Sequence, residues 1–186
     1  MRFEAMLIKL PEVPQGSRIG ILGGSFDPPH LGHPTLALAA LATHSLDQIW
    51  VIPCKEHPFS KKLTVFEHRF KMSQYAFRRI RDVEVLDIER HLPIPNHTYI
   101  TLMEILKLRP DLDLSLILGS DLLEGLSTWK QAKELQKMFK IYVFDRASLC
   151  PSMSSTNIRE MAFQGFYEHL DVAVQAYIRK KRLYRS

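Results

Sequence analysis

The sequence predicts an α/β fold, in which about five parallel strands form a doubly wound sheet with helices on both faces. Short apolar runs rich in β-branched residues alternate along the chain with longer segments of helical periodicity. The chain of 186 residues is long enough to bury the core of one such sheet, and it contains no internal repeat. No apolar run approaches the ~20 residues that a membrane helix needs, so we expect no membrane partner.

The strands are predicted from short apolar runs. Arg18-Ile-Gly-Ile-Leu and Gln48-Ile-Trp-Val-Ile-Pro are the first two, and both are typical of buried strands. The predicted strands span about residues 18–23, 48–53, 83–88, 112–118 and 141–144. Because crossovers between parallel strands are right-handed, the loops that follow these strands are expected at one edge of the sheet.

The helices are predicted from periodicity and from their starting residues. Thr35-Leu-Ala-Leu-Ala-Ala-Leu-Ala is a strong helix former with Pro34 near its first turn. Phe66, Phe70 and Phe77 recur on one side of a second helix. The predicted helices span about residues 34–44, 65–80, 97–108, 156–164 and 171–181, with a short helical region at about 121–138.

Composition places the chain among ordinary globular proteins. Residues 1–17 contain several turn formers and are interpreted as an N-terminal extension, with a single domain over residues 18–186. The net charge of +5 suits an anionic ligand and would suit a nucleic acid equally well. Cys54 and Cys150 are too few and too far apart for a disulfide framework or a zinc site. The start of the chain makes a poor signal peptide, so we expect a cytoplasmic protein.

The most informative stretch joins the first strand to its helix. At Gly23-Gly24 no Cβ blocks the approach of a ligand to the backbone, and two prolines then force a turn. His30 and His33 follow where the helix begins, and ligands of open parallel sheets bind at this position. Free N–H groups at the helix start would favour an anion. We interpret the two histidines as phosphate donors; a metal pair lacks a third ligand, and plain loop histidines are the other alternative.

A second stretch, Ser154-Ser-Thr-Asn-Ile-Arg, also opens a helix. Its hydroxyl and amide side chains are natural N-caps. Hydroxyls, N–H groups and the guanidinium of Arg159 would then converge at one helix start and bind a polyphosphate. The alternative is an ordinary cap beside a surface arginine.

Gly23-Gly-Ser-Phe-Asp-Pro-Pro-His-x-Gly-His resembles the signature of the nucleotidylyltransferases that make dinucleotide cofactors. It is most similar to the bacterial nicotinate-nucleotide adenylyltransferases. The second stretch is similar to their Ile-Ser-Ser-Thr-x-Ile-Arg, with Met153 in the first position. The resemblance covers about residues 18–184 and implies a Rossmann-like fold. It assigns catalysis to His30, His33 and Arg159. It assigns ATP binding to these three and to Gly23, Gly24, Ser25, Phe26, Gly119, Asp121, Arg146, Ser154, Ser155 and Thr156.

The resemblance also indicates where a pyridine mononucleotide binds, namely at Ser25, Thr98, Thr101 and Trp129. In the family, an aromatic residue at the position of Trp129 stacks on the pyridine ring; a core tryptophan is the alternative. His97 stands where the family usually has Tyr, in the segment that lines the nicotinate pocket. Either Lys61 or Lys62 takes the place of a lysine in the loop after the second strand, and Arg69 matches a family arginine.

The resemblance implies adenylyl transfer from ATP to nicotinate mononucleotide, which gives deamido-NAD and pyrophosphate in NAD biosynthesis. Mg²⁺ is expected as a cofactor bound mainly through the ATP phosphates, with no protein metal site. The alternatives are a sister adenylyltransferase for nicotinamide mononucleotide or phosphopantetheine, and a non-catalytic nucleotide sensor. A nucleic-acid-binding module ranks last, because the basic residues are scattered. The oligomeric state stays open.

Overall fold

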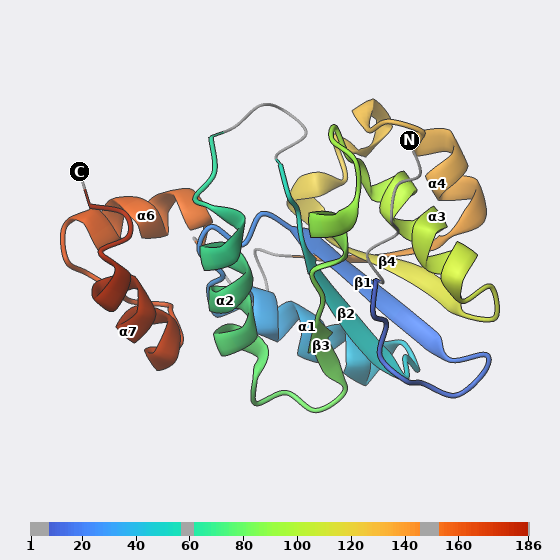
Figure 1. Ribbon diagram of the computed structural model, residues 1–186, viewed down its shortest axis with the longest axis horizontal. Helices are drawn as coiled ribbons and strands as arrows, with labels where there is room; N and C mark the ends of the chain where they lie inside the picture. The colour runs from blue at the N-terminus through green and yellow to red at the C-terminus, as the bar shows by residue number, and fades with distance from the viewer. Residues whose placement is uncertain (1–7, 57–61, 146–152, 186) are drawn as a thin grey trace.

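The computed structural model describes residues 8–56, 62–145 and 153–185. Within them, five parallel strands form one sheet in the order β3-β2-β1-β4-β5 (Figure 1). The strands are β1 (Arg18–Gly24), β2 (Gln48–Pro53), β3 (Val83–Val85), β4 (Asp113–Gly119) and β5 (Lys140–Phe144). The chain thus leaves β1 toward one edge of the sheet and returns to β4 on the other side of β1. This arrangement confirms the predicted doubly wound parallel sheet.

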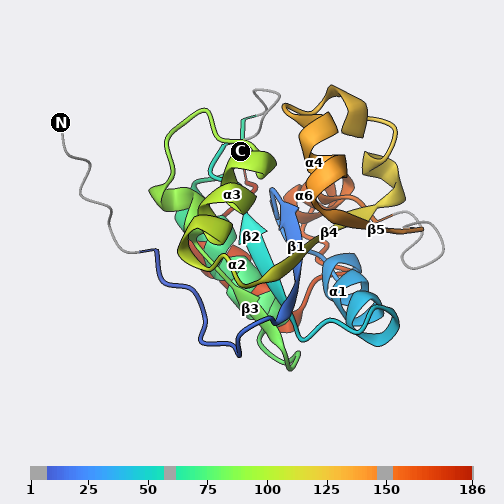
Figure 2. The same ribbon diagram turned by 90° about the vertical axis from the view of Figure 1, so that its right-hand side faces the viewer.

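Alternation along the strands produces two core layers. Trp50 and Ile52 pack with one apolar cluster, whereas Ile49 and Val51 pack with the other. Helices α3 (Thr98–Leu108) and α4 (Ala132–Met138) cover the first face, and α1 (Gly32–Thr43) and α2 (Phe66–Phe77) cover the second. Figure 2 shows α3 and α1 on opposite sides of the strands. The three central strands β2, β1 and β4 are therefore buried on both faces, as their near-continuous apolar runs predict, whereas the edge strands β3 and β5 are partly exposed.

Two C-terminal helices, α6 (Ser155–Phe163) and α7 (Val172–Lys181), form a third cluster. In it, Met72 of α2 packs with Ile158 of α6 and with Val174 and Ile178 of α7. Figure 1 shows both helices beyond α2, away from the sheet. Helix α2 therefore has two apolar sides, one toward the sheet and one toward the C-terminal helices.

Three elements differ from the prediction, and one is helix α2, which ends at Phe77 rather than near residue 80. Strand β3 is shorter than the predicted 83–88, because the chain turns into the 3-10 helix η1 (Ile88–His91). The predicted helical region at 121–138 divides into the 3-10 turns η2 (Ser120–Leu122) and η3 (Leu126–Thr128) and helix α4. Gln131, with φ of 55°, is left-handed and separates η3 from α4.

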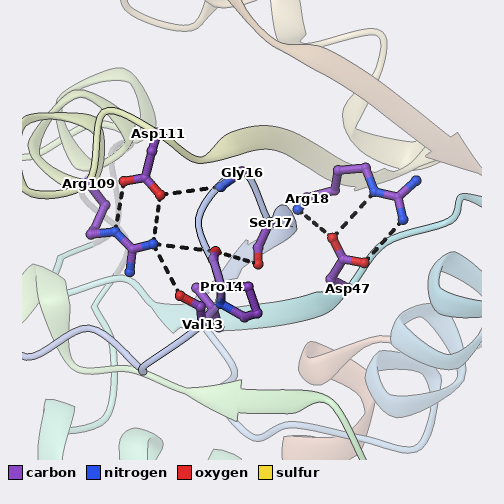
Figure 3. A network of polar contacts seen from close by, with 8 residues as sticks. All are labelled: Val13, Pro14, Gly16, Ser17, Arg18, Asp47, Arg109 and Asp111. Carbon is purple, nitrogen blue, oxygen red and sulfur yellow. Dashed lines mark hydrogen bonds and ion pairs between the residues drawn. The ribbon is translucent and has the colours of Figure 1, made fainter.

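The described part of the N-terminal segment, residues 8–17, lies against the body of the protein. It has no helix or strand, but Ile8, Leu10 and Val13 pack on the core cluster beneath α3. Figure 3 shows Arg109 binding Asp111 through two hydrogen bonds and donating to the carbonyl of Val13 at 3.2 Å. Packing and hydrogen bonds therefore fix this segment across the edge of the core.

Candidate active site

Strands β1 and β4 separate at their carboxyl ends. At this point the strand order reverses, because β2 and β3 lie on one side of β1, and β4 and β5 lie on the other. The pairing of β1 with β2 continues to Gly24, and that of β4 with β5 continues to Gly119. The pairing of β1 with β4 stops earlier, at Ile21 and Leu116. The carboxyl ends of β1 and β4 are thus not joined by ladder hydrogen bonds. This is the switch point at which an open α/β sheet binds its ligand.

His30 and His33 lie at the start of α1 beside this opening, with ring centroids 3.9 Å apart. His30 is 1% exposed, and His33 is partly buried. The backbone N–H of Gly32 donates to Nδ1 of His30 at 3.2 Å, and the backbone N–H of His30 donates to Nδ1 of His33 at 3.0 Å. A neutral ring whose Nδ1 accepts carries its proton on Nε2. We therefore assign both rings the Nε2–H tautomer, and an N–H group of this kind is a suitable donor to a phosphate oxygen.

The expectation of free N–H groups at this helix start is wrong. The N–H groups of His30 and Gly32 bind imidazole nitrogens, that of Leu31 binds the carbonyl of His169, and that of His33 binds the carbonyl of His30. The backbone is used to orient the two rings. Any donors that α1 offers to an anion are therefore imidazole groups.

The glycines and Phe26 shape the loop in different ways. A Cβ on Gly23 would meet no atom within 4 Å, so the backbone there is open to a ligand. A Cβ on Gly24 would lie 3.2 Å from the ring of Phe26. That ring is 1% exposed and packs edge-on against His33, with centroids 4.9 Å apart. The Phe26 side chain thus supports His33 from the interior, and the assignment of Phe26 to ATP binding stays a prediction.

Helix α6 begins against the same loop. The side chain of Ser154 accepts the backbone N–H of Asn157 at 3.1 Å, which confirms the predicted N-cap. The hydroxyl of Ser155 donates to the carbonyl of Pro28 at 3.0 Å. The two sequence stretches are thus brought together, although more than a hundred residues separate them in the sequence.

Asp27 accepts hydrogen bonds from three segments that meet at this loop, and it was not among the residues predicted from the sequence. Its carbonyl accepts a hydrogen bond from Arg159 at 2.6 Å, and Arg159 also donates to the hydroxyl of Thr156 at 3.2 Å. Its carboxylate accepts the backbone N–H of Thr64 at 3.0 Å and the hydroxyl of Tyr184 at 2.7 Å. Asp27 is 2% exposed. These contacts therefore hold the guanidinium of Arg159 against the loop between β1 and α1, residues 25–31, which is called the histidine loop.

Arg69, on α2, joins the loops that follow β1 and β2. Its buried guanidinium donates to the carbonyls of Ser25 at 2.8 Å, Lys55 at 3.1 Å and Thr64 at 2.7 Å. A guanidinium has five N–H donors in a rigid plane, so one side chain satisfies all three carbonyls. The family match of Arg69 thus has a physical basis, since Arg69 sets the spacing of two loops at the carboxyl edge.

The start of α3 is the expected acceptor site. His97 is the N-cap residue, makes no side-chain capping bond and lies in a helix with no acid in its first turn. Thr98 is partly buried, whereas Thr101 is 2% exposed. The hydroxyl of Thr101 donates to Glu89 at 3.0 Å and accepts the amide of Asn96 at 2.8 Å. Thr101 therefore lies behind the helix start rather than on its surface.

Three further predicted residues follow β4: Gly119 ends the strand, Asp121 lies in η2, and Trp129 follows η3. Trp129 is partly buried and packs on the core cluster next to α3, so one part of its side chain belongs to the core. Gly119 ends β4 and is buried, whereas Asp121 in η2 is exposed. Asp121 is thus placed beside the switch point, with its carboxylate at the surface.

Some predicted residues lie outside the described residues, namely Arg146 and Lys61. Lys62 is described and exposed. No group of three or more His, Cys, Asp or Glu suited to a metal ion occurs in the described ranges. Within the same ranges, no helix is both long enough and apolar enough to span a membrane.

Comparison with known sequences reveals close relatives over nearly the whole chain. Residues 21–161 match the family model described as cytidylyltransferase-like. A protein of Anaeromyxobacter dehalogenans strain 2CP-1, named "Probable nicotinate-nucleotide adenylyltransferase", is 35% identical over 184 residues, which cover 92% of this chain and 98% of the relative. A protein of the same name from Methylacidiphilum infernorum is 34% identical, with 90% of this chain and 92% of the relative covered.

Solved structures show the same fold. The nicotinic acid mononucleotide adenylyltransferase of Plasmodium falciparum, complexed with NaAD, superposes with a TM-score of 0.73 at 23% identity, covering 90% of this chain and 97% of the other. The same enzyme complexed with APC gives a TM-score of 0.70 at 22% identity, with the same coverage. The TM-scores show that this chain shares the fold of these structures.

Proposed function

This chain belongs to the cytidylyltransferase-like family and, within it, to the nicotinate-nucleotide adenylyltransferases, and we propose on that basis that it transfers the adenylyl group of ATP to nicotinate mononucleotide. The products are deamido-NAD and pyrophosphate. We place the protein in the cytoplasm, where ATP is available and where thiols such as that of Cys54 stay reduced.

One observation carries the proposal: the His30–His33 pair and Arg159 converge on a single loop at the switch point. Two Nε2–H groups and a guanidinium are donors to phosphate oxygens. In the reaction, a 5′-phosphate oxygen of the mononucleotide attacks the α-phosphorus of ATP while the bond to the pyrophosphate oxygen breaks. The donors stabilise the negative charge that grows on the α-phosphate and on the departing pyrophosphate. The attacking group comes from the substrate, so no covalent enzyme intermediate is needed.

Catalysis by this site is positioning together with charge stabilisation. Correct orientation of two bound nucleotides lowers the barrier by ~7–11 kcal/mol in favourable cases. The loop that carries His30 and His33 is held by hydrogen bonds on both sides, through Asp27 and through the Leu31 N–H. Such a loop presents its donors without reorganisation during the reaction, which is the condition for effective electrostatic stabilisation.

The acceptor pocket is assigned to the start of α3, beside Trp129. An uncapped helix start with no acidic residue in its first turn favours a carboxylate. Burial lowers the pKa of His97, so this ring is neutral at physiological pH and the helix end supplies the positive potential. Thr98 lies in that first turn, while Thr101, held by Glu89, supports the turn from inside.

Magnesium fits this site as an ion delivered with ATP. The residues around the histidine loop are imidazole, hydroxyl and guanidinium groups, and the carboxylate of Asp27 is engaged by Thr64 and Tyr184. Mg²⁺ prefers oxygen ligands and usually keeps its waters and the phosphate oxygens of its substrate. When bound, it supplies further neutralisation of the triphosphate charge.

A second acceptor is favoured by one specific observation. Oδ1 of Asn96, a 9% exposed residue just before α3, accepts no hydrogen bond among the described residues. A buried carbonyl oxygen without a donor suits the NH₂ of an amide better than a carboxylate. Nicotinamide mononucleotide is therefore the second candidate acceptor.

The test is pyrophosphate release from ATP with each mononucleotide and with phosphopantetheine, together with identification of the dinucleotide product by mass spectrometry. We expect release with nicotinate mononucleotide and a product with the mass of deamido-NAD. Release that requires phosphopantetheine, or ATP binding without release for any acceptor, would contradict the proposal; the latter result would indicate a nucleotide sensor.

A further inference from the structure

We propose that Tyr184 is a positioning residue for the adenylyl transfer, which it serves by holding Asp27 and, through Asp27, the loop that carries His30 and His33. The expected effect on catalysis rests on the proposed function. The expected effect on the position of His30 and His33 rests only on the hydrogen bonds of the loop.

Asp27 links three separate parts of the chain to the histidine loop. Its Oδ1 accepts the Tyr184 hydroxyl at 2.7 Å, and its Oδ2 accepts the N–H of Thr64, just before α2. Its carbonyl accepts Arg159 of α6. The carboxylate is 2% exposed, so it depends on protein donors rather than on water. Among the described residues, the carboxylate has these two donors, and a substitution can remove the Tyr184 hydroxyl without altering the backbone.

Tyr184 reaches Asp27 because the chain reverses after α7. Arg182 has φ of 54° and Tyr184 has φ of 59°, both left-handed. The N–H of Leu183 donates back to the carbonyl of Ile178 at 3.1 Å, which closes the end of the helix. Left-handed backbone is unfavourable for residues other than glycine, so the surroundings must compensate for it. Leu183 and Tyr184 pack on the third apolar cluster, and the Tyr184 hydroxyl binds Asp27.

The Tyr184 hydroxyl is a constant donor. Burial, with the nearby Asp27 carboxylate as a second cause, raises the pKa of Tyr184 far above its usual value. The phenol therefore keeps its proton across the whole working range of pH. Because this donor does not change its protonation state, the hydrogen bond can hold Asp27 in place at every working pH but cannot act as a pH switch.

Loss of the hydrogen bond between Tyr184 and Asp27 is expected to displace Asp27 and the groups attached to it. Asp27 lies three residues before His30 and also accepts Arg159, so movement of Asp27 shifts both groups of phosphate donors together. A misplacement of about 1 Å can reduce turnover by a factor of ~10². The expected signature is a lower kcat with little change in the KM for ATP, because the ligand-binding groups are all still present.

Tyr177 supplies a matched control. It lies on α7, and its hydroxyl shares a hydrogen bond with Nδ1 of His68 on α2 at 2.9 Å, whereas the Tyr184 hydroxyl binds Asp27. Tyr177→Phe and Tyr184→Phe each remove one phenolic hydroxyl from the same C-terminal unit. A purely structural role predicts the same outcome for both.

The first experiment needs no substrate. The imidazole signals of the eight histidines are recorded by ¹H–¹⁵N NMR in the native protein and in both variants. We expect Tyr184→Phe to shift the ring signals of His30 and His33, and Tyr177→Phe to shift those of His68 alone. Unchanged His30 and His33 signals in a folded Tyr184→Phe variant would overturn the inference, whatever reaction the native protein performs.

The second experiment is kinetic. We expect Tyr184→Phe to lower kcat for adenylyl transfer about 10- to 100-fold with the KM for ATP within about twofold, and Tyr177→Phe to keep native kcat. Equal kcat in the two variants would refute the catalytic consequence. If the native protein itself shows no transfer, the proposed function fails separately, and the NMR result still decides the positioning role.

Discussion

The backbone N–H of His30 donates to Nδ1 of His33 across 3.0 Å, so one catalytic candidate fixes the ring orientation of the other. Nδ1 of His33 also lies 3.2 Å from the carbonyl oxygen of His30, so this side of the ring faces the loop backbone. Nδ1 of His33 thus faces the loop, and Nε2 lies on the opposite side of the ring. The pair therefore works as a unit in which His30 is interior and His33 is accessible.

Replacement of His33 by alanine is expected to lower kcat by about 10²–10³, as for the loss of other transition-state donors, while the Kd for ATP changes little. His44, at the other end of α1, is the control, because its ring stacks on Tyr142 and takes no part in the loop. Steady-state kinetics and ATP titration check this. A His33→Ala enzyme with native kcat would remove His33 from the catalytic residues.

Arg159→Lys is expected to recover only part of the activity that Arg159→Ala loses. The guanidinium donates to Asp27 and Thr156 through two different nitrogens, and a planar group of this kind also forks onto phosphate oxygens. An ammonium group cannot reproduce both contacts. Comparison of kcat/KM for the two variants is the measurement; equal activity of Arg159→Lys and the native protein would reduce Arg159 to a diffuse positive charge.

Two glycines of β1 are expected to respond in opposite ways to alanine. A Cβ on Gly20 would lie 2.6 Å from Cδ1 of Ile117 and 2.8 Å from Cδ1 of Leu46, so Gly20→Ala should cost about 1–3 kcal/mol of unfolding free energy. A Cβ on Gly23 meets no protein atom, so Gly23→Ala should leave stability within ~0.5 kcal/mol.

If the Gly23 backbone faces ATP, the same Gly23→Ala change should raise the KM for ATP about tenfold, which corresponds to ~1.4 kcal/mol of lost binding. Urea unfolding and ATP saturation curves on the two variants separate the effects. Native ATP saturation in Gly23→Ala would show that ATP does not approach this backbone.

The fold could be predicted from the sequence because it depends on local signals. The apolar runs of β1, β2 and β4 are long, and their helices have clear periods, so each element was found close to its place. The end of β3 was missed because Glu89 turns back to bind the N–H of Lys55, a contact between residues far apart in the sequence. The division of 121–138 was not predicted either, since a left-handed Gln131 has no residue signature.

The candidate site could be predicted only in part. The histidines and the Ser154–Arg159 stretch have unusual local chemistry, and the structure brings them together. Asp27 and Tyr184 form a hydrogen bond over 157 positions, which no local pattern records. Ile8, Leu10 and Val13 did offer a signal, since apolar residues that recur within a short stretch before the first strand indicate packing.

Cys54 is expected to be an unreactive thiol. Burial raises its pKa to about 11, although Arg69 opposes the shift. In a Cys150→Ser background, we expect reaction with a disulfide reagent to be slow at pH 8 and to accelerate as the pH approaches 11. An unfolded thiol has a pKa of about 8.5, so between about pH 8.5 and 11 the unfolded chain loses a proton that the folded chain keeps. The contribution of Cys54 to unfolding free energy therefore falls as pH rises through that window. Rapid reaction with a midpoint near pH 8.5 would show that the thiol is accessible.

Adenylation of nicotinate mononucleotide by this chain is tested most directly by comparing the acid with its amide. The uncapped start of α3 favours the carboxylate, whereas Oδ1 of Asn96 would favour the amide. The measurement is kcat/KM for nicotinate and nicotinamide mononucleotide at the same saturating ATP concentration. A pocket that leaves a polar group unmatched can discriminate by ~10⁴ or more, so we predict a large ratio in favour of the acid. A ratio near one, or a preference for nicotinamide mononucleotide, would contradict the account.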